Sequence, residues 1–445
     1  RAGTVMTSGR NSEHDRFAYF SDPMMIGLVS LALAMPVSLG TVFKIELTPT
    51  FLLAPVIAYA IWITRFDVVT KVFVLAGICG IVSVTIVNLW APGNVKGNVA
   101  ELVIWTMFAP SFVFLGRLLP IKEVVFRLGV VSAVFLVAIT VPLLITGHPT
   151  RAMSVVDIRG FGRGSYLDVH FFGLPVYASF GVNSLAALFC IQAALICAAL
   201  FSSSNSLKAL LAAGLACASL LILESDSRAA QGSLLLLVLA IAIFAVIDRR
   251  TLASVTLIEL SILLGVVTAS LRTSADIRLV SLVTDIVRAW VLGHEQSALG
   301  HPTMESVTTG RTILWKAAIR DVMHSPIFGN GFSGYGRFFP VVTGPNTTAH
   351  CYYLTILWKG GIVFAVPFAF FIALAFRRAW QHRVAGSEWY FAATALVLMF
   401  LLPSLTWDIL MIPSAGALAW FVLGLLQGPF KIDSEIEYRH AAQTV

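Results

Sequence analysis

The stretch TTGRTILWKAAIRDVMHSPIFGNGFSGYGRFFPVVTGPNTTAHCYYLTILWKGG, residues 308–361, is the least membrane-like long segment of an otherwise apolar sequence. Thr308 or Thr309 can cap a helix, and Trp315, Ile319 and Val322 then recur at i, i+4 and i+7 on one helix face. Arg311 lies one turn before Trp315 on the same side. The stretch therefore predicts a helix in a loop between apolar runs.

A glycine-rich segment follows this predicted helix. Pro326 ends the helix, and four glycines lie between Gly329 and Gly336. Such a backbone suits close approach by a ligand. His350 closes the segment at the start of the next apolar run, so we expect the chemistry of this protein in the loop that ends at His350.

The composition identifies an integral membrane protein. Of 445 residues, 58% are hydrophobic and 12% are charged, and the mean hydropathy is +0.87, which excludes an ordinary soluble domain. A net charge of +7 would favour nucleic acid as the partner of a soluble protein. Basic loops on the cytoplasmic side of a membrane explain it here, so we expect membrane lipids as partners and no nucleic acid.

Apolar runs near the length that crosses a bilayer, roughly 20 residues, recur along the chain. They predict an all-α polytopic protein with a single membrane domain over residues 1–445 and about 12 transmembrane helices. The predicted spans lie near 23–43, 50–64, 68–89, 99–116, 124–146, 179–200, 206–223, 229–247, 251–270, 354–376, 389–406 and 409–427.

The basic residues of the short connections predict the orientation. They concentrate on one side, as at Arg117, Arg249 and Arg377, and this side is expected to be cytoplasmic. The protein would then lie in a bacterial inner membrane, with both termini on the cytoplasmic side. The outer loop at 147–178 and the large loop at 271–349 would face the periplasm.

The outer loop at 147–178 carries Arg151, Arg159 and Arg163 among glycines and aromatic residues. Two interpretations remain open. The loop can lie as an interfacial segment on the bundle, with Arg159 and Arg163 supporting a site, or these arginines can bind lipid headgroups without any catalytic part.

Arg228 follows Ser227 at the start of a predicted span, where a cation is costly unless it is paired or faces water. It can hold an anion in a cavity. Alternatively, it extends to the membrane interface, or it pairs with Glu224 or Asp226.

Three arginines at or after the predicted loop helix are further candidates: Arg311, Arg320 and Arg337. A guanidinium suits phosphate because its planar fork of donors can bind two oxygens at once. The alternative is a solvated helix face. The shared face of Arg311 and Trp315 favours the phosphate-binding interpretation.

His350 lies at the junction of the large loop with a predicted span. A neutral imidazole there can take a proton from a sugar hydroxyl, because its usual pKa lies near the working pH. A histidine at a helix start can equally be a cap or a core residue. The sequence alone leaves both roles open.

No sequence motif calls for a metal or a cofactor. We find no Walker loop, Rossmann fingerprint, HExxH or nucleophile elbow. The five cysteines have no metal-ligand spacing, and the first predicted outer loop offers only Glu46 as an acid. We therefore expect neither a metal nor another cofactor.

Three motifs together resemble the O-antigen ligase and Wzy-type polysaccharide polymerase superfamily, the membrane proteins that share a ligase/polymerase C-terminal domain. The resemblance covers residues 224–361, the expected core that includes loop 271–349. One difference is Cys351, which stands where the family usually has Asn. The motifs are Ser227-Arg228; Gly310-Arg311 with Leu314-Trp315, Pro326, Gly329 and Gly331; and Ala349-His350 with Tyr353-Leu354 and Gly360-Gly361.

The resemblance implies a GT-C-like glycosyltransferase. Its donor would be a glycan on undecaprenyl diphosphate, and transfer would be metal-independent with inversion at the anomeric carbon. Arg228 and Arg311 would bind the diphosphate, and His350 would act as general base on the acceptor hydroxyl. The residues that could support this site are Arg159, Arg163, Trp315, Arg320, Arg337 and Tyr353.

Two acceptors fit the resemblance. A ligase passes the glycan to lipid A–core, and a polymerase passes it to another lipid-linked repeat unit. Two other classes of protein remain as alternatives: a transporter or flippase for lipid-linked glycans, and a structural membrane subunit. A transporter would be expected to have broken or polar helices near the bilayer midplane and a repeated half.

Overall fold

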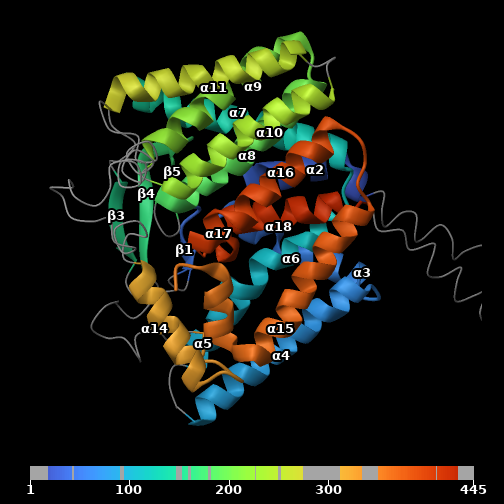
Figure 1. Cartoon of the computed structure of the whole chain (residues 1–445), viewed down its shortest axis with the longest axis vertical. Helices are drawn as coiled ribbons and strands as arrows, with labels where there is room; N and C mark the ends of the chain where they lie inside the picture. The colour runs from blue at the N-terminus through green and yellow to red at the C-terminus, as the bar shows by residue number, and fades with distance from the viewer. Residues whose placement is uncertain are drawn as a thin grey trace, which may run out of the picture.

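The computed structural model describes residues 19–42, 45–90, 95–146, 153–158, 162–178, 182–225, 227–248, 252–273, 311–332, 349–406 and 408–428. Helices dominate this part of the chain (Figure 1). Most of the predicted loop 271–349 lies outside the described residues. Its described parts are residues 271–273, which belong to the end of α11, the helix α14 (Arg311–His324) with the turns that follow it, and Ala349.

Within the described ranges, nine helices are long and apolar enough to cross a membrane, which is consistent with a multi-pass membrane protein. They are α4 (Val68–Trp90), the run α5–η3–α6 (Val95–Gly116), α7 (Ile121–Thr146), α8 (Val182–Ser202), α9 (Asn205–Glu224), α10 (Arg228–Ile247), α11 (Leu252–Thr273), α15 (Tyr352–Gln381), and α16 (Ser387–Leu401) with α17 (Pro403–Thr406). Three shorter apolar helices accompany them: α2 (Pro23–Ala34), η2–α3 (Pro49–Ile63) and α18 (Ala415–Leu426).

These helices fall on the predicted spans, but the first and last spans are shorter than the sequence suggested. Helix α2 ends at Ala34 because Pro36 disfavours helical geometry at the residue before it. The chain then forms a hairpin of β1 (Thr41–Val42) and β2 (Ile45–Glu46). Pro413 similarly separates the 3-10 turn η6 (Ile409–Met411) from α18.

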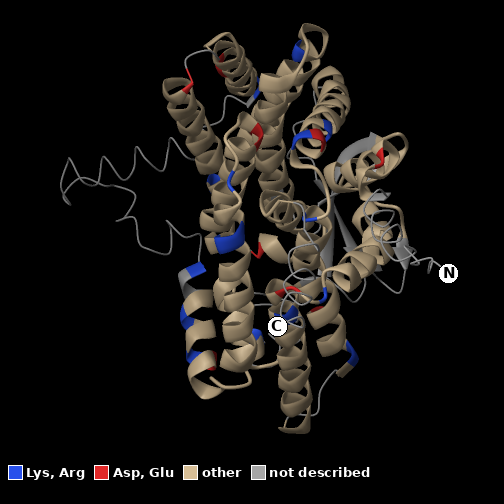
Figure 2. Cartoon of the chain, turned by 90° about the vertical axis from the view of Figure 1, so that its right-hand side faces the viewer, with Lys and Arg blue, Asp and Glu red and all other residues tan. Residues whose placement is uncertain are grey.

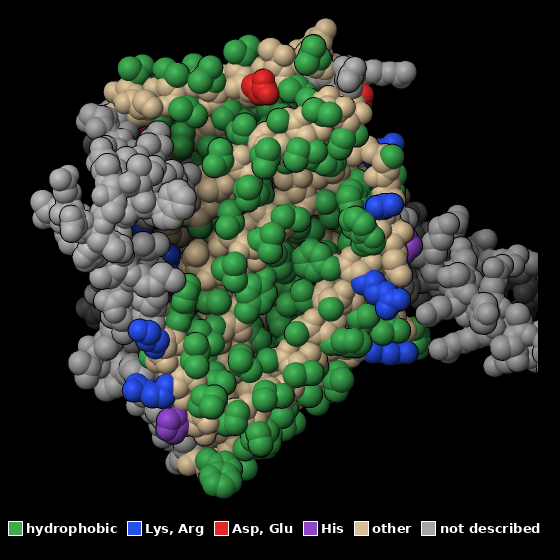
Figure 3. All heavy atoms as spheres, viewed as in Figure 1, with side chains coloured by type: hydrophobic (Ala, Val, Ile, Leu, Met, Phe, Trp, Pro, Cys, Tyr) green, Lys and Arg blue, Asp and Glu red, His purple; other side chains and the backbone are tan. Residues whose placement is uncertain are grey.

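Charged residues occupy little of the helical ribbon (Figure 2). On the face of the molecule that Figure 3 shows, apolar side chains cover α10, α15 and α16, and Lys and Arg gather at its two edges. This distribution is the one expected of a surface that faces lipid.

The predicted outer loop contains a three-stranded antiparallel sheet, which the sequence analysis did not anticipate. Its strands are β3 (Met153–Ile158), β4 (Gly162–Phe171) and β5 (Leu174–Ala178), with β4 in the middle. Phe172 and Gly173 both have positive φ in the turn between β4 and β5, as a two-residue hairpin requires. A bridge from Val37 to Val176 ties the sheet to the end of α2.

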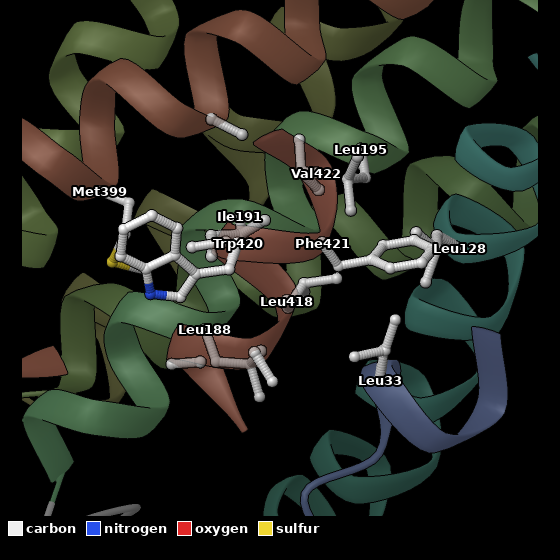
Figure 4. Close-up of a cluster of buried hydrophobic side chains, with 14 of the residues drawn as sticks. Leu33, Leu128, Leu188, Ile191, Leu195, Met399, Leu418, Trp420, Phe421 and Val422 are labelled. Atoms are coloured by element: carbon white, nitrogen blue, oxygen red, sulfur yellow. The ribbon is translucent and has the colours of Figure 1, made fainter. Parts of the chain in front are cut away.

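Helix α18 fills the centre of the bundle. All twelve of its residues are buried, and Trp420 and Phe421 pack among side chains from α2, α7, α8 and α16 (Figure 4). Gly424 and Gly116 let α18 and α6 approach closely, because a Cβ on either residue would overlap the backbone of the other helix. The core of the protein therefore surrounds a helix that is itself too short to be among the nine.

A buried charge network closes one end of the bundle, which we call the Asp67 end. Asp67 accepts from Arg117 at 2.7 Å and from Arg378 at 2.6 Å. Burial lowers the pKa of Arg117 to about 10, against the attraction of Asp67. One carboxylate thus joins the start of α4 to the ends of α6 and α15.

Candidate functional site

The opposite end of the bundle, where α10 and α15 begin, brings together the residues that the sequence singled out. We call it the His350 end. Helix α14 lies across this end, next to the first turns of α15 (Figure 1). The helix packs on α15 through Ala318 and Val322, which contact a cluster containing Ala349, Leu354 and Trp358.

The predicted apolar face of α14 is wrong in one respect. Ile319 was placed on the buried face with Trp315 and Val322, yet it is 53% exposed. The buried positions are Ala317, Ala318 and Asp321. Small side chains make the contact because α14 lies close to the first turns of α15, whereas Ile319 points away from them.

The segment after α14 lies along a break in α15. At Gly361 the backbone leaves helical geometry, with φ 62° and ψ −170°. The amide groups of Asn330 and Gly331 donate to the carbonyls of Trp358 and Lys359, each at 3.0 Å.

Amide groups of α15 also donate hydrogen bonds to the segment that follows α14. The amide of Ile362 donates to Pro326 at 2.9 Å, and the amide of Val363 donates to Ile327 at 3.0 Å. In a regular helix, residues 358 and 359 would pair with 362 and 363. Segment 326–331 therefore satisfies the backbone groups that the break releases, and it fixes α14 to α15.

The contact between this segment and α15 requires glycine at positions 329 and 361. A Cβ on Gly329 would lie 2.5 Å from the amide nitrogen of Gly361 and from the carbonyl oxygen of Lys359. A Cβ on Gly361 would overlap the backbone of Gly329 and Ile327. Of the glycine-rich segment that was expected to suit a ligand, Gly329 thus approaches the backbone of Gly361, and Gly334 and Gly336 lie outside the described residues.

His350 is held in an uncommon backbone conformation at the start of α15. Its φ is 49°, in the left-handed region, where histidine is enriched among non-glycine residues. The amide of Ala349 donates to the buried hydroxyl of Thr355 at 3.2 Å, and the amide of Thr355 donates to Cys351 at 2.8 Å. Such conformations concentrate at functional sites, where the surrounding structure holds them in place.

Arg228 is the first residue of α10, and its turn is well fixed. The Ser227 hydroxyl caps the helix by accepting from the amide of Ala230. The side-chain amide of Gln231 donates to the carbonyls of Leu223 and Ser225, both at 3.1 Å. Glu224, an expected partner of Arg228, forms an ion pair at 2.9 Å with Arg272 of α11.

Arg228, Arg311 and His350 lie close enough for their charges to interact, although they come from three separate segments. Burial lowers the pKa of Arg311, and the nearby charge of Arg228 adds to this shift. Both arginines also begin helices, whose N-termini carry partial positive charge. The site therefore concentrates positive potential where an anion can bind.

Asp408 is the fourth member of this cluster. Burial lowers the pKa of His350 below its usual 6.5, Asp408 opposes the shift, and Arg311 adds to it. Asp408 itself is 7% exposed, and within the described residues no hydrogen-bond donor reaches either of its carboxylate oxygens. Turn η6 follows it and is anchored to α18, because the indole of Trp420 donates to Leu410 at 3.0 Å.

The sequence analysis missed Asp408. A signal was present, because Asp408 is a lone acid in the short gap between the last two predicted spans. That gap falls on the side to which the predicted orientation assigns His350. An ionisable residue at such a place is a functional candidate.

The remaining candidate residues lie elsewhere or serve other contacts. Trp315 is half-buried, one turn after Arg311, and no acceptor in the described part of the chain meets its indole N–H. Arg320 is exposed and nine residues beyond Arg311, which places it on the opposite side of α14. The hydroxyl of Tyr353 donates to Phe400 of α16 at 2.8 Å, so it supports packing.

Two of the supporting arginines, Arg159 and Arg337, lie outside the described residues. Arg163 lies in β4 opposite Asp157 of β3. Cys351, at the family's usual Asn position, is the N-cap residue of α15 but makes no side-chain capping bond. Burial raises the pKa of its thiol, which therefore stays protonated at neutral pH.

Among the described residues, no group of three or more His, Cys, Asp or Glu side chains is arranged to hold a metal ion. The polar groups that the cluster offers are two guanidinium groups, an imidazole and a carboxylate. The guanidinium forks suit phosphate oxygens, and the imidazole suits proton transfer.

No protein-family model and no curated protein sequence matches this chain. The resemblance to the ligase and polymerase superfamily therefore rests on the three motifs and on where their residues lie.

Proposed function

We propose that the protein is a membrane glycosyltransferase of the O-antigen ligase and polysaccharide polymerase type. It would transfer a glycan from undecaprenyl diphosphate to a hydroxyl on lipid A–core or on another lipid-linked repeat unit. The observation that carries the proposal is the meeting of Arg228, Arg311 and His350 at one end of an apolar bundle. That end would face the periplasm of the inner membrane.

The two arginines would bind the donor diphosphate. Each begins a helix and lies within range of the other's charge, so the two cations repel each other. A diphosphate offsets this repulsion and offers oxygens to both guanidinium forks. Their positive charge supports departure of the diphosphate as an anion, without a proton from the protein.

His350 would activate the acceptor. Its lowered pKa keeps the imidazole neutral at neutral pH, as a general base requires. An imidazole nitrogen takes the hydroxyl proton while the acceptor oxygen forms a bond to the anomeric carbon. The bond from that carbon to the diphosphate oxygen breaks, and its electron pair leaves with the diphosphate. Attack opposite the leaving group inverts the anomeric configuration.

Asp408 would stabilise the imidazolium that forms when His350 takes the proton. It is a buried carboxylate whose charge favours the protonated form of His350. Asp408 and Arg311 thus act on the imidazole in opposite directions. Diphosphate binding would cancel part of the effect of Arg311 and make His350 a stronger base when donor is present.

The test is an assay of the purified protein with an undecaprenyl-diphosphate-linked repeat unit, with EDTA present, read as product size on a gel. A ladder without lipid A–core identifies a polymerase, and product only with lipid A–core identifies a ligase. His350→Ala should yield no product while remaining folded. Normal product length and amount from this variant would remove His350 from catalysis.

One observation favours a transporter or flippase as a second candidate. Helix α15 is broken at Gly361, and buried Lys359 beside the break forms an ion pair with Glu101 of the π-helical segment η3 (Glu101–Met107). Broken helices with buried charges are typical of transporters. Here, however, segment 326–331 bonds the backbone groups at the break, so they are not available to a transported ligand.

The two candidates differ in their product. A transporter would move labelled lipid-linked glycan across reconstituted vesicles without changing glycan length or attachment. A glycosyltransferase would change the length or the attachment in detergent, where no second compartment exists.

A further inference from the structure

Helix α14 has an exposed face that the proposed function does not use. Lys316, Arg320 and His324 follow one another at i, i+4 and i+8, and all three are exposed. Residues at this spacing form a stripe along one side of a helix. The stripe lies on the side of α14 opposite Arg311, away from the candidate site.

A second, apolar stripe runs beside the basic one. Ile319 and Met323 are 53% and 75% exposed, and Ile327, in the turn that follows α14, is 56% exposed. Such large apolar side chains in a row are unfavourable in water. An exposed helix with adjacent apolar and basic stripes has the pattern of a helix that lies in a membrane interface.

The position of α14 agrees with this pattern. The helix packs on the first turns of α15, so it lies at the level where the membrane spans end. Figure 1 shows it running crosswise to α15. Figure 3 shows Lys, Arg and His side chains over α14 at the edge of the exposed apolar face. At that level, the headgroup phosphates of the lipids lie next to the hydrocarbon.

We propose that α14 is an interfacial helix that binds the anionic phospholipid headgroups of the leaflet at the His350 end. The apolar stripe enters the hydrocarbon, and the basic stripe meets the phosphates. The aliphatic stems of Lys316 and Arg320 let their charges reach the headgroups. Because Arg311 begins the same helix, lipid binding also fixes the height and rotation of Arg311 in the candidate site.

Occupants other than lipid are less suited to this face. Water solvates the basic stripe but not the apolar one. A protein partner would need acidic groups matched to Lys316 and Arg320, together with an apolar ridge beside them. A phospholipid leaflet provides both layers: its anionic headgroups can meet the basic stripe, and its hydrocarbon can take up the apolar stripe.

The test uses the whole protein in vesicles, with its cysteines replaced and a spin label at Met323→Cys. Phosphatidylcholine vesicles with increasing phosphatidylglycerol are compared, and the label is probed with oxygen and with a water-soluble paramagnetic nickel complex. We expect the label to be accessible to oxygen, and phosphatidylglycerol to lower its accessibility to the nickel complex. This readout needs no enzymatic activity, so the outcome is independent of the proposed function.

Variants identify the groups responsible. Each of Lys316→Gln and Arg320→Gln should weaken the apparent affinity for phosphatidylglycerol about fivefold, as expected for one basic side chain near a lipid surface. The matched control is Lys71→Gln with Lys122→Gln, two exposed lysines at the Asp67 end, which should leave the response unchanged.

Three outcomes would overturn the proposal. The first is a label accessible to the nickel complex in every lipid, which would mean that α14 faces water. The second is a label shielded from both reagents, which would mean that protein covers the face. The third is an unchanged phosphatidylglycerol response in Lys316→Gln and Arg320→Gln, which would mean that other groups bind the headgroups.

Discussion

The backbones of Gly329 and Gly361 meet where segment 326–331 crosses the break in α15, and neither residue has room for a side chain. The four hydrogen bonds around this contact join α14, which carries Arg311, to α15, which follows His350. This contact between two glycines therefore helps, together with the packing of α14 on α15, to set the separation of the two candidate functional residues.

Replacing Gly361 by Ala should destabilise the protein and abolish activity. Its φ and ψ fall in a region that is essentially restricted to glycine, which alone costs about 1–3 kcal/mol, and the new Cβ would overlap Gly329 and Ile327. Thermal unfolding in detergent measures the loss. Gly232→Ala in α10 is the control, because its nearest neighbour would be 3.7 Å away. Equal melting temperatures for the two variants would contradict the role of this contact.

The activity should depend on pH through His350. Only the neutral imidazole accepts a proton, so the rate rises with pH through the pKa of His350. Because burial lowers that pKa, the acid limb should lie below 6.5. Initial rates between mildly acidic and neutral pH locate it. A limb above 6.5 would mean that another group, or a protonated His350, controls the rate.

Asp408→Asn should move this acid limb further toward low pH and reduce the maximal rate about tenfold or more. The pH shift follows because Asp408 raises the pKa of His350, so its removal lets burial and Arg311 lower that pKa further. A purely structural role would reduce the amount of folded protein without moving the limb. An unmoved limb in a folded variant would show that Asp408 does not act on His350.

Arg311→Lys should lower the activity about tenfold to a hundredfold, because lysine keeps the charge but loses the two-pronged donor set. The loss should appear mainly in the KM for the lipid-linked donor. Arg65→Lys is the matched control, since Arg65 is exposed at the Asp67 end and this variant should retain activity. Full activity in Arg311→Lys would argue against a bidentate contact with phosphate.

Asp67→Asn should destabilise the protein by about 3–5 kcal/mol, because it leaves Arg117 and Arg378 facing each other with no carboxylate between them. The measurement is again thermal unfolding. Glu123→Gln removes an ion pair to Arg127 that is much more exposed, so it should cost less than about 1 kcal/mol. Similar losses of stability in both variants would show that burial of the Asp67 network does not add to its effect on stability.

The helical membrane architecture could be predicted from the sequence because each span needs an apolar run of its own. The helix α14, its start near Arg311 and its end before Pro326 could also be predicted from local signals. The buried face of α14 could not, because it depends on how close α15 approaches. Alanines pack there, and Ile319 is left exposed.

Only part of the candidate site could be predicted from the sequence. Arg228, Arg311 and His350 each stood at the start of a predicted helix, and helix starts on one side of a membrane can meet. Asp408 carried a weaker signal, and its closeness to His350 depends on η6, whose position is set by the buried Trp420 of α18. Similarly, the pairing of Glu224 with Arg272 depends on the packing of α9 against α11, which no local pattern encodes.

The central position of α18 has a consequence for how the protein is made. This helix follows every other described helix in the chain, yet their side chains pack around it. A ribosome delivers it after the other described helices, so these helices must remain in the bilayer without their central helix until α18 arrives. Its twelve residues are also short for recognition as an independent span. Completion of the bundle should therefore occur only once α18 has been made, and chains that stop before Ala415 should be degraded even though the nine longer described spans have already been inserted.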